Sequence, residues 1–333
     1  MTLGVELINN RDIPPNCPSR GLVGIVGIGA VGAAIAMAVV LRARVRELIL
    51  IDRNRARAKA VATDMHYGVP LSPMVSVADG EYSDLAGAGV TIIAAGVNEK
   101  SGGATDRNDP LGRLRLLDAN VKVFEDIIPR IVKVAPQTVL LVTTDPPEPL
   151  ADIARNLAGH NRVVSTSTYL DSLRFRVHLA ERLGVSPAYV DSYVIGEHGT
   201  SSVFLWSSAR VGSMRVEDLL MSRGIALGEF RQAIEHDVRF ANISIIEGIG
   251  ASQYGIGMVA ARLAEIVLRD ERAVVPVGSY NARSGVTVSL PSVVGSSGVN
   301  EILWPEMSDD EDRALEHSAE ILRTAVAKYV KTS

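Results

Sequence analysis

The sequence of 333 residues has a single cysteine and almost no net charge (−4). Cys17 cannot form an internal disulfide or, alone, a thiolate metal site, which fits a reducing cytoplasm and gives no reason to expect a metal. The balance of 34 basic and 38 acidic residues provides no electrostatic attraction to nucleic acids or anionic membranes. We therefore expect small molecules and other protein chains as partners.

The N-terminal segment lacks the features of a secretory signal. Residues 1–20 have no basic start, no apolar middle and no small-residue cleavage pattern, and they include the polar, Pro-rich stretch RDIPPNCPSR. We interpret residues 1–20 as an exposed N-terminal arm that could embrace a neighbouring subunit.

One long apolar run has to be distinguished from a membrane helix. Residues 21–41, GLVGIVGIGAVGAAIAMAVVL, carry no charge and are followed by Arg42, Arg44 and Arg46, as in a membrane helix with a basic cytoplasmic flank. The first half of the run, however, contains several glycines among β-branched residues, which favours a strand and a tight turn over a continuous helix. We expect no membrane span here.

The first half of the chain alternates short apolar runs with helical patterns. The runs LVGIVG, LILID, MVSVA, VTIIAAG and TVLLVTT are separated by segments of helical periodicity, one beginning near Ala30 and one extending through Asp64. Strands that are apolar throughout and joined by helices indicate a parallel sheet covered on both faces. We therefore predict a Rossmann-type α/β domain with a doubly wound parallel sheet at residues 21–160.

Beyond residue 160 the pattern becomes mixed. It predicts a strand at VDSYVIGE, helices near 229–247 and 252–269, strands at RAVVPVGS and GVTVSL, and a last helix that opens with a capping box at Ser308–Glu311. That helix carries apolar residues on one face: Leu315, Ala319, Leu322, Val326 and Tyr329. We predict a mixed α+β domain at residues 161–333 and a ligand cleft between the two domains.

A glycine-rich turn, GIGAVG, lies between the first apolar strand and an Ala-rich helix. Gly27 would permit the turn, Gly29 would let the backbone approach a pyrophosphate at the helix N-terminus, and Gly32 would let the helix pack on the strand. The strand, the helix and the glycine spacing together predict dinucleotide binding, with contacts from Gly27, Gly29, Ala30, Val31 and Gly32.

An acidic residue at the end of the next strand extends this prediction. Asp52 would accept hydrogen bonds from the ribose hydroxyls of the adenosine half. The same carboxylate would repel a 2′-phosphate, so we expect NAD rather than NADP. Arg53 and Arg55 could weaken this preference, although a role as solvated loop charges is the simpler interpretation.

Over residues 21–330 the chain resembles the lactate/malate dehydrogenase superfamily. The shared motifs occur in the family's order: GIGAVG, LILIDRN, DMHYG, AAGVN, DPPEPL, YLDSLRFR, GEHGTSSV and SQYGIG. The resemblance implies an NAD-dependent L-2-hydroxy acid dehydrogenase, similar to lactate dehydrogenase, that acts in the cytoplasm as a homodimer or homotetramer. It also implies that 21–160 binds NAD and that 161–333 is the substrate and catalytic domain.

The resemblance assigns chemistry to three residues. His198, in GEHG, would be the proton shuttle, Asp171 its partner, and Arg174 the anchor of the substrate carboxylate. Reduction of a 2-oxo acid needs a proton at the carbonyl oxygen as hydride reaches carbon, and imidazole titrates near neutral pH. A guanidinium can bind a carboxylate through two parallel hydrogen bonds. From the residues alone, Asp171 and Arg174 could equally form a solvated salt bridge.

Other site residues follow from the same resemblance. Arg113, at the start of the helix after the loop, would polarise the substrate carbonyl, with Arg115 as the competing candidate. Ser252 would lie near the substrate. Further cofactor contacts would come from Ala95, Gly96 and Ile256.

The loop after AAGVN should select the substrate, and three interpretations stay open. Counting back six residues from Arg113 gives Arg107, which would attract the second carboxylate of oxaloacetate, as in malate dehydrogenases. Counting forward from VN gives Glu99, which would repel it. A long lid could also enclose a bulky side chain, as in branched-chain 2-hydroxy acid dehydrogenases. Arg107 could, finally, be a plain solvent-facing charge.

Two departures from the family pattern concern the chemistry. Asp145 stands where the family has asparagine, so one hydrogen-bond donor toward the substrate is lost unless Asp145 is protonated. Thr200 replaces the acid or amide that often follows GEHG. A protein that binds NAD without catalysis is therefore the alternative from another class. An NAD- and metal-dependent glycosidase fits less well, because no cysteine accompanies His198.

Overall fold

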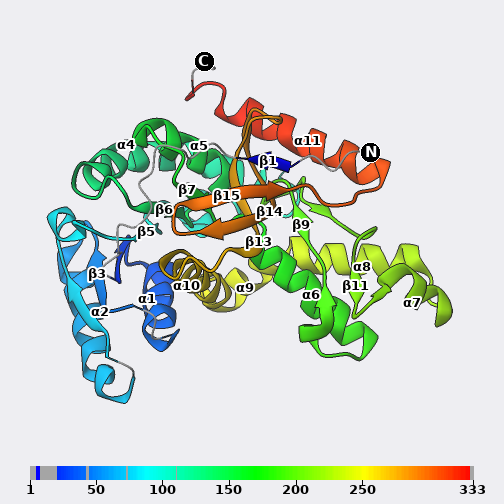
Figure 1. The fold of residues 1–333 in the computed structure, drawn as a ribbon, viewed down its shortest axis with the longest axis horizontal. Helices are drawn as coiled ribbons and strands as arrows, with labels where there is room; N and C mark the ends of the chain where they lie inside the picture. The colour runs from blue at the N-terminus through cyan, green and yellow to red at the C-terminus, as the bar shows by residue number, and fades with distance from the viewer. Residues whose placement is uncertain (1–4, 8–20, 43–44, 73, 110, 331–333) are drawn as a thin grey trace.

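The computed structural model describes residues 5–7, 21–42, 45–72, 74–109 and 111–330 (Figure 1). Its centre is one mixed sheet of ten strands in the order β1-β15-β14-β13-β7-β6-β5-β2-β3-β4. Of the predicted N-terminal arm, β1 (Val5–Leu7) pairs antiparallel with β15 of the same chain. The rest of the arm, with Cys17, lies outside the described residues.

The part of this sheet from β4 to β7 is parallel, and it confirms the predicted doubly wound fold. The strands β3 and β4 follow one another outward on one side of β2, and β5, β6 and β7 do so on the other side. Where the strand order reverses in this way, a crevice forms at the carboxyl ends of the strands. The last parallel strand lies beyond residue 160, and the division at 160/161 stays a prediction. The parallel strands are β2 (Leu22–Val26), β3 (Glu47–Ile51), β4 (Ser76–Asp79), β5 (Val90–Ile93), β6 (Val139–Val142) and β7 (Val163–Ser165).

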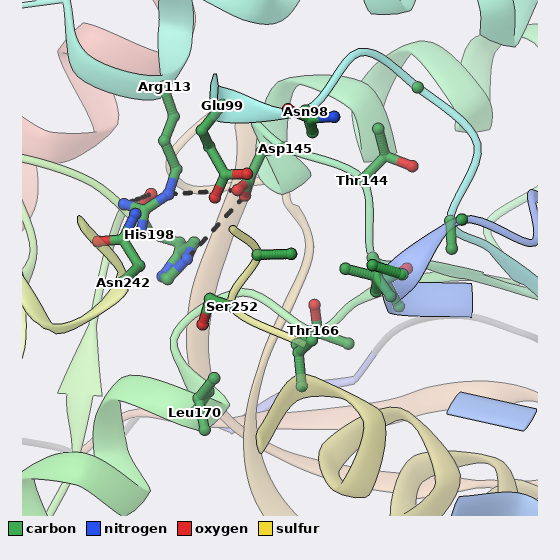
Figure 2. A pocket seen from close by; sticks show the side chains of 18 of the residues that line it. Asn98, Glu99, Arg113, Thr144, Asp145, Thr166, Leu170, His198, Asn242 and Ser252 are labelled. Atoms are coloured by element: carbon green, nitrogen blue, oxygen red, sulfur yellow. Dashed lines mark hydrogen bonds and ion pairs between the residues drawn. The ribbon is translucent and has the colours of Figure 1, made fainter. Parts of the chain in front are cut away.

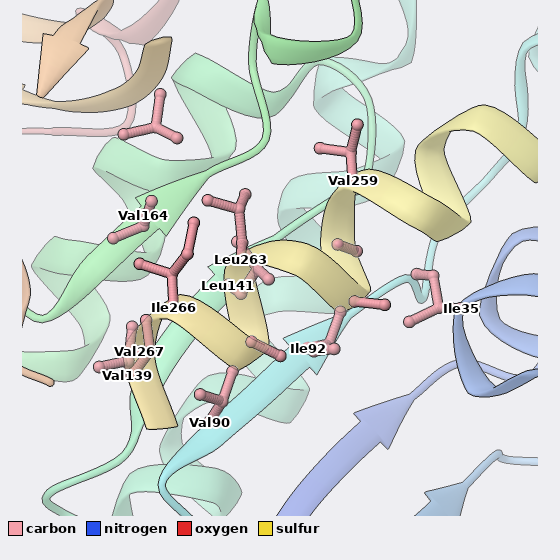
Figure 3. Close-up of a cluster of buried hydrophobic side chains, with 14 of the residues drawn as sticks. Ile35, Val90, Ile92, Val139, Leu141, Val164, Val259, Leu263, Ile266 and Val267 are labelled. Atoms are coloured by element: carbon pink, nitrogen blue, oxygen red, sulfur yellow. The ribbon is translucent and has the colours of Figure 1, made fainter. Parts of the chain in front are cut away.

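Both faces of the parallel sheet are buried at its central strands β2, β5 and β6, which explains why these strands are almost entirely apolar. In β6, Val139 and Leu141 belong to one core and Leu140 and Val142 to the other, because successive side chains point to opposite faces. Figure 3 shows α10 packed over β5 and β6 on the first face. The helices of the first core are α1 (Ala30–Arg42), α2 (Arg55–Gly68) and α10 (Tyr254–Leu268), and those of the second are α4 (Leu117–Val134) and α5 (Pro147–Ala158).

The apolar run 21–41 is divided between β2, the glycine turn and α1, as the glycines predicted. Within the part of the chain that the structure describes, no helix combines the length and apolar character needed to cross a membrane.

Antiparallel strands extend the sheet beyond β7. The junction is close: a Cβ on Gly278 of β13 would lie 2.1 Å from Ser165 Oγ of β7, so glycine is required there. The helix α11 (Asp309–Val326) packs over these strands, and its predicted capping box at Ser308 and Glu311 is present. The antiparallel strands are β13 (Ala273–Asn281), β14 (Val286–Gly295) and β15 (Gly298–Leu303).

A third core joins the helices that follow β7. Phe175 and Trp206 lie at its centre, with ring centroids 4.8 Å apart in an edge-on arrangement. This core belongs to α6 (Tyr169–Leu183), α7 (Val216–Ser222), α8 (Leu227–Arg239) and the short strands β8 (Val190–Asp191), β9 (Val194–Ile195), β10 (Val203–Phe204) and β11 (Arg210–Val211). The strand β12 (Met214–Arg215) pairs with β11.

Two predicted elements are divided in the structure. The predicted helix 229–247 is interrupted at Phe240 (φ −102°, ψ 5°), where α8 ends and α9 (Ala241–Ile249) begins. The predicted strand VDSYVIGE forms β8 and β9, because β8 pairs with β11 whereas β9 pairs with β10.

Candidate active site

The geometry of the glycine turn fits the three roles that its spacing predicted. Gly27 has φ +95°, and a Cβ there would lie 2.4 Å from Ala95 N. A Cβ on Gly32 would lie 1.9 Å from Gly27 O, so this glycine allows α1 to approach β2. In contrast, no atom lies within 4 Å of the Cβ position of Gly29. The open backbone at Gly29, directly before α1, is the cradle that a dinucleotide pyrophosphate requires, and a side chain would fill it.

The acid after β3 is tied to this turn. Asp52 Oδ2 accepts a hydrogen bond from Ile28 N at 2.7 Å, and Oδ1 accepts one from Asn54 N at 2.8 Å. The side chain keeps lone pairs for a ribose hydroxyl, so its placement fits an adenosine dinucleotide. Arg55 is directed toward acids, at 3.3 Å from Asp79 and in contact with Glu81.

A pocket runs from the glycine turn to the predicted catalytic residues (Figure 2). It therefore connects the nucleotide cradle with the residues from the second half of the chain. Of the predicted site residues, those that line it are Gly29, Ala30, Val31, Gly96, Glu99, Arg113, Asp145, Arg174, His198, Ser252 and Ile256.

His198, Asp171 and Arg174 lie together, as predicted. His198 Nδ1 contacts Asp171 Oδ2, which leaves Nε2 toward the pocket. Arg174 Nη1 donates to Asp171 Oδ1 at 3.0 Å, and Arg174 Nη2 lies 3.4 Å from Ser252 Oγ. The two segments converge because α6 carries Asp171 and Arg174 past the loop that follows β9. One carboxylate thus orients both the imidazole and the guanidinium.

Burial sets the charges of this group. Burial lowers the pKa of His198, as does the charge of Arg113, while Asp171 opposes both effects. Burial would raise the pKa of Asp171, but His198 and Arg174 lower it below its ordinary value. Asp171 is therefore ionised and His198 is neutral in the free protein at neutral pH.

Arg113, rather than Arg115, reaches the pocket. Arg113 Nε lies 3.3 Å from Asp145 Oδ2, and Asp145 Oδ1 lies 4.0 Å from His198 Nε2. Arg115 instead pairs with Asp109, whose Oδ2 is 2.6 Å from its Nε. Glu99, at the start of the short helix α3 (Glu99–Gly102), is within hydrogen-bonding distance of Asp145.

Arg107 lies outside this pocket. Its Nη1 is 2.6 Å from Glu247 Oε1, and its Nη2 is 2.9 Å from Oε2, so the guanidinium binds α9 through both nitrogens. It lines a second hollow, between residues 104–109, Gly112 and the helices α8 and α9, together with the exposed Thr200. Of the two candidates for contact with the substrate side chain, Glu99 is the one in the pocket that holds His198.

Comparisons with known protein families find a matching model for each of two parts of this chain. Residues 22–164 match the model of the lactate/malate dehydrogenase NAD binding domain, and residues 168–333 match that of the family's alpha/beta C-terminal domain. The chain belongs to the lactate/malate dehydrogenase family. The predicted membership and the predicted NAD-binding domain are thereby confirmed.

The relatives of this dehydrogenase-family chain cover nearly all of it. An L-lactate dehydrogenase of Thermus aquaticus is 43% identical over 312 residues, which is 92% of this chain and 98% of the relative. One of Deinococcus radiodurans is 43% identical, over 90% of this chain and 97% of the relative. The crystal structure of the minor L-lactate dehydrogenase of Enterococcus mundtii superposes with a TM-score of 0.86 at 30% identity, over 93% of this chain and 99% of that one.

The sequence did not single out several residues of this family member's site. Glu148 is completely buried on α5, and its Oε1 accepts hydrogen bonds from His198 N at 3.0 Å and from Ser167 Oγ. Asn120 on α4 donates to the Asp145 carbonyl oxygen at 2.7 Å. Asn242, in the first turn of α9, lines the pocket. Only the position of Glu148 in DPPEPL, three residues after Asp145, offered a signal.

Proposed function

We propose that the protein is an NAD-dependent L-2-hydroxy acid dehydrogenase of the lactate type, which interconverts a 2-hydroxy acid and a 2-oxo acid. The observation that carries this proposal is the contact of His198 Nδ1 with Asp171, which leaves Nε2 facing a pocket that also contains Arg174 and Arg113. A proton donor, a carboxylate anchor and a second cation then surround one space. The names of the relatives, L-lactate dehydrogenase, support the same reaction.

Each of these residues has a defined task. Arg174, held by Asp171, binds the substrate carboxylate, and Arg113 polarises the C2 oxygen. NAD, when bound, accepts the hydride from C2 of the hydroxy acid or returns it to the oxo acid. His198 Nε2 takes the hydroxyl proton in oxidation and gives it back in reduction. The negative charge of a bound carboxylate offsets Arg113 and Arg174, and so it favours the protonated imidazole that reduction needs.

We propose that the substrate has one carboxylate. A carboxylate on Arg174 and a carbonyl oxygen on His198 direct the remaining substituent of C2 toward the end of the pocket that holds Glu99 and Asp145. A second carboxylate there would meet acids. For malate-type specificity, Arg107 would have to leave Glu247, to which both of its terminal nitrogens are bound. A branched, uncharged side chain remains compatible with this pocket.

We further propose a homo-oligomer, a dimer or tetramer, that works in the cytoplasm. The packed helices α1 and α10 expose Leu41 (68%), Tyr254 (67%) and Met258 (65%), a surface that a second copy could cover. The proposal of a cytoplasmic location rests on the single cysteine.

The test is a substrate panel. The wild-type protein should oxidise NADH with pyruvate and 2-oxobutyrate, and kcat/KM for oxaloacetate should be lower. His198→Asn should lose about 10²- to 10⁴-fold in kcat, while NADH still binds in a fluorescence titration. Arg107→Gln should leave the preference unchanged; a selective loss with oxaloacetate would favour malate. Normal turnover by His198→Asn, or NADH binding without turnover of any 2-oxo acid by the wild type, would refute the proposal.

A further inference from the structure

Two carboxyl groups meet in the wall of the pocket. Glu99 and Asp145 are within hydrogen-bonding distance, and Figure 2 shows their carboxyl groups side by side. Ionised carboxylates only accept hydrogen bonds, so a hydrogen bond between two of them requires a proton on one. The side chain of Asp145 is largely withdrawn from solvent, with 19% of its area exposed, and water cannot fully screen the repulsion.

The other groups around the pair do not balance its charge. Arg113 faces Asp145 from the 3-10 turn Gly112–Leu116, and Glu148 adds a further carboxyl from α5. From α6 come Asp171 and Arg174, which pair with one another. With His198 neutral, Arg113 is thus the cation left to offset both Glu99 and Asp145. A substrate carboxylate adds one more negative charge, so the uptake of one proton by the pair is favourable.

We propose that Glu99 and Asp145 share one proton in the free protein, and that with substrate bound Asp145 keeps this proton and turns it from Glu99 to the substrate oxygen that exchanges a proton with His198, to which it donates a hydrogen bond. This inference rests on the proposed function. Asp145 Oδ1 is 4.0 Å from His198 Nε2. A substrate oxygen at about 2.8 Å from His198 Nε2 can therefore also lie at about 2.8 Å from Asp145 Oδ1. Burial raises the pKa of Asp145 well above its ordinary value, Arg113 opposes this, and Glu99 adds to it.

The shared proton is not consumed. In oxidation the hydroxyl proton passes to His198 Nε2, and the hydride leaves C2 for NAD, while the carboxyl proton stays on Asp145, hydrogen-bonded to the substrate oxygen instead of to Glu99. Its hydrogen bond stabilises the negative charge that develops on the substrate oxygen. A protonated acid at position 145 can therefore do what an amide does, but only below the pH at which the pair releases its proton.

The test follows kcat/KM for oxidation of a 2-hydroxy acid against pH. In the wild type kcat/KM should rise as His198 becomes neutral and fall as the pair ionises. Asp145→Asn carries a fixed donor and should keep the rise but lose the fall. Asp118→Asn, the same change at an exposed carboxylate on α4, is the control and should keep both limbs.

A second variant tests whether catalysis needs the proton on Asp145 or only the shape of the side chains at positions 99 and 145. The amide of Glu99→Gln donates to Asp145, so Asp145 ionises and the substrate loses its donor; kcat/KM should fall about 100-fold. Adding Asp145→Asn to Glu99→Gln should restore most of it. An alkaline fall that persists in Asp145→Asn, or an Asp145→Asn variant that binds NADH but is inactive, would overturn the proposal.

Infrared difference spectroscopy provides a readout that does not depend on turnover. Wild-type protein and Glu148→Gln, in which the other buried carboxyl with a raised pKa cannot ionise, should both lose the C=O band of the pair's protonated carboxylic acid across the alkaline fall, and Glu99→Gln and Asp145→Asn should lack this band. A wild type that catalyses the reaction without this band would refute the shared proton and leave the dehydrogenase function intact. A wild type that oxidises no 2-hydroxy acid would refute the proposed function, whatever the band shows.

Discussion

Glu148 should make the protein less stable as the pH rises, and Glu148→Gln should remove this effect. Burial raises the pKa of Glu148 from 4.5 to about 8, and the hydrogen bond from Ser167 only partly opposes it. The folded protein therefore keeps this carboxyl protonated at pH values where the unfolded chain has released the proton. The folded state binds more protons between these two values, so stability falls as the pH increases through that range.

The magnitude follows from the two pKa values. Each pH unit between 4.5 and about 8 corresponds to about 1.4 kcal/mol, so the full effect is on the order of 5 kcal/mol. Most of it, roughly 4 kcal/mol, should develop between about pH 5 and pH 9. Glutamine resembles the protonated acid: its Oε1 can still accept from His198 N and Ser167 Oγ, and it cannot ionise.

The assay is urea unfolding, monitored by circular dichroism, at about pH 5 and at about pH 9. Glu148→Gln and wild type should be similar near pH 5, and the variant should become more stable by several kcal/mol near pH 9. Glu229→Gln, at an exposed position on α8, is the matched control and should stay within about 0.5 kcal/mol of wild type at both. A stability difference that does not grow with pH, or a variant that is less stable at alkaline pH, would show that Glu148 is ionised in the folded protein.

Two further predictions concern the cofactor cradle and the assembly. Gly29→Val should raise the Kd for NADH at least about tenfold without lowering Tm, since nothing lies near its Cβ position. Gly32→Ala should instead lower stability by about 1–3 kcal/mol, because its Cβ would lie 1.9 Å from Gly27 O. Equal effects of the two variants on Tm would contradict these roles. Met258→Glu should shift the oligomer toward smaller species in sedimentation velocity, because it places charge on the exposed face of α10; an unchanged sedimentation coefficient would exclude this surface from the interface.

The sequence was informative where a local pattern determines the structure. The glycine spacing of GIGAVG predicted the turn because the positive φ of Gly27 and the contact of Gly32 with Gly27 O depend on backbone geometry within a few residues. The apolar strands predicted a sheet covered on both faces, and the capping box at Ser308 predicted the start of α11. The segments with Asp171 and His198 were related through the resemblance to a family, since no local pattern brings residues from α6 and the loop after β9 together.

The sequence could not predict which residue of the substrate loop, Arg107 or Glu99, lies in the pocket. Counting from either end of the loop gave Arg107 or Glu99, because an insertion makes the two counts disagree. In the structure α3 forms directly after Asn98 and places Glu99 beside Asp145, whereas Arg107 extends to Glu247 on α9. The partner that decides the position of Arg107 lies 140 residues away in the sequence. Hydrophobic periodicity contains no information about such a pair.

Burial of the ionisable groups around His198 affects the pH range of the protein at both its acid and its alkaline end. Burial lowers the pKa of His198, so moderate acid does not remove the neutral imidazole that oxidation requires. Burial also raises the pKa of Glu148 to about 8, so alkali ionises a carboxyl that the fold holds without full compensation. Neutralising one such acid should extend stability to higher pH. Changing Asp145 should instead extend the pH range of catalysis, which makes the two effects separable by experiment.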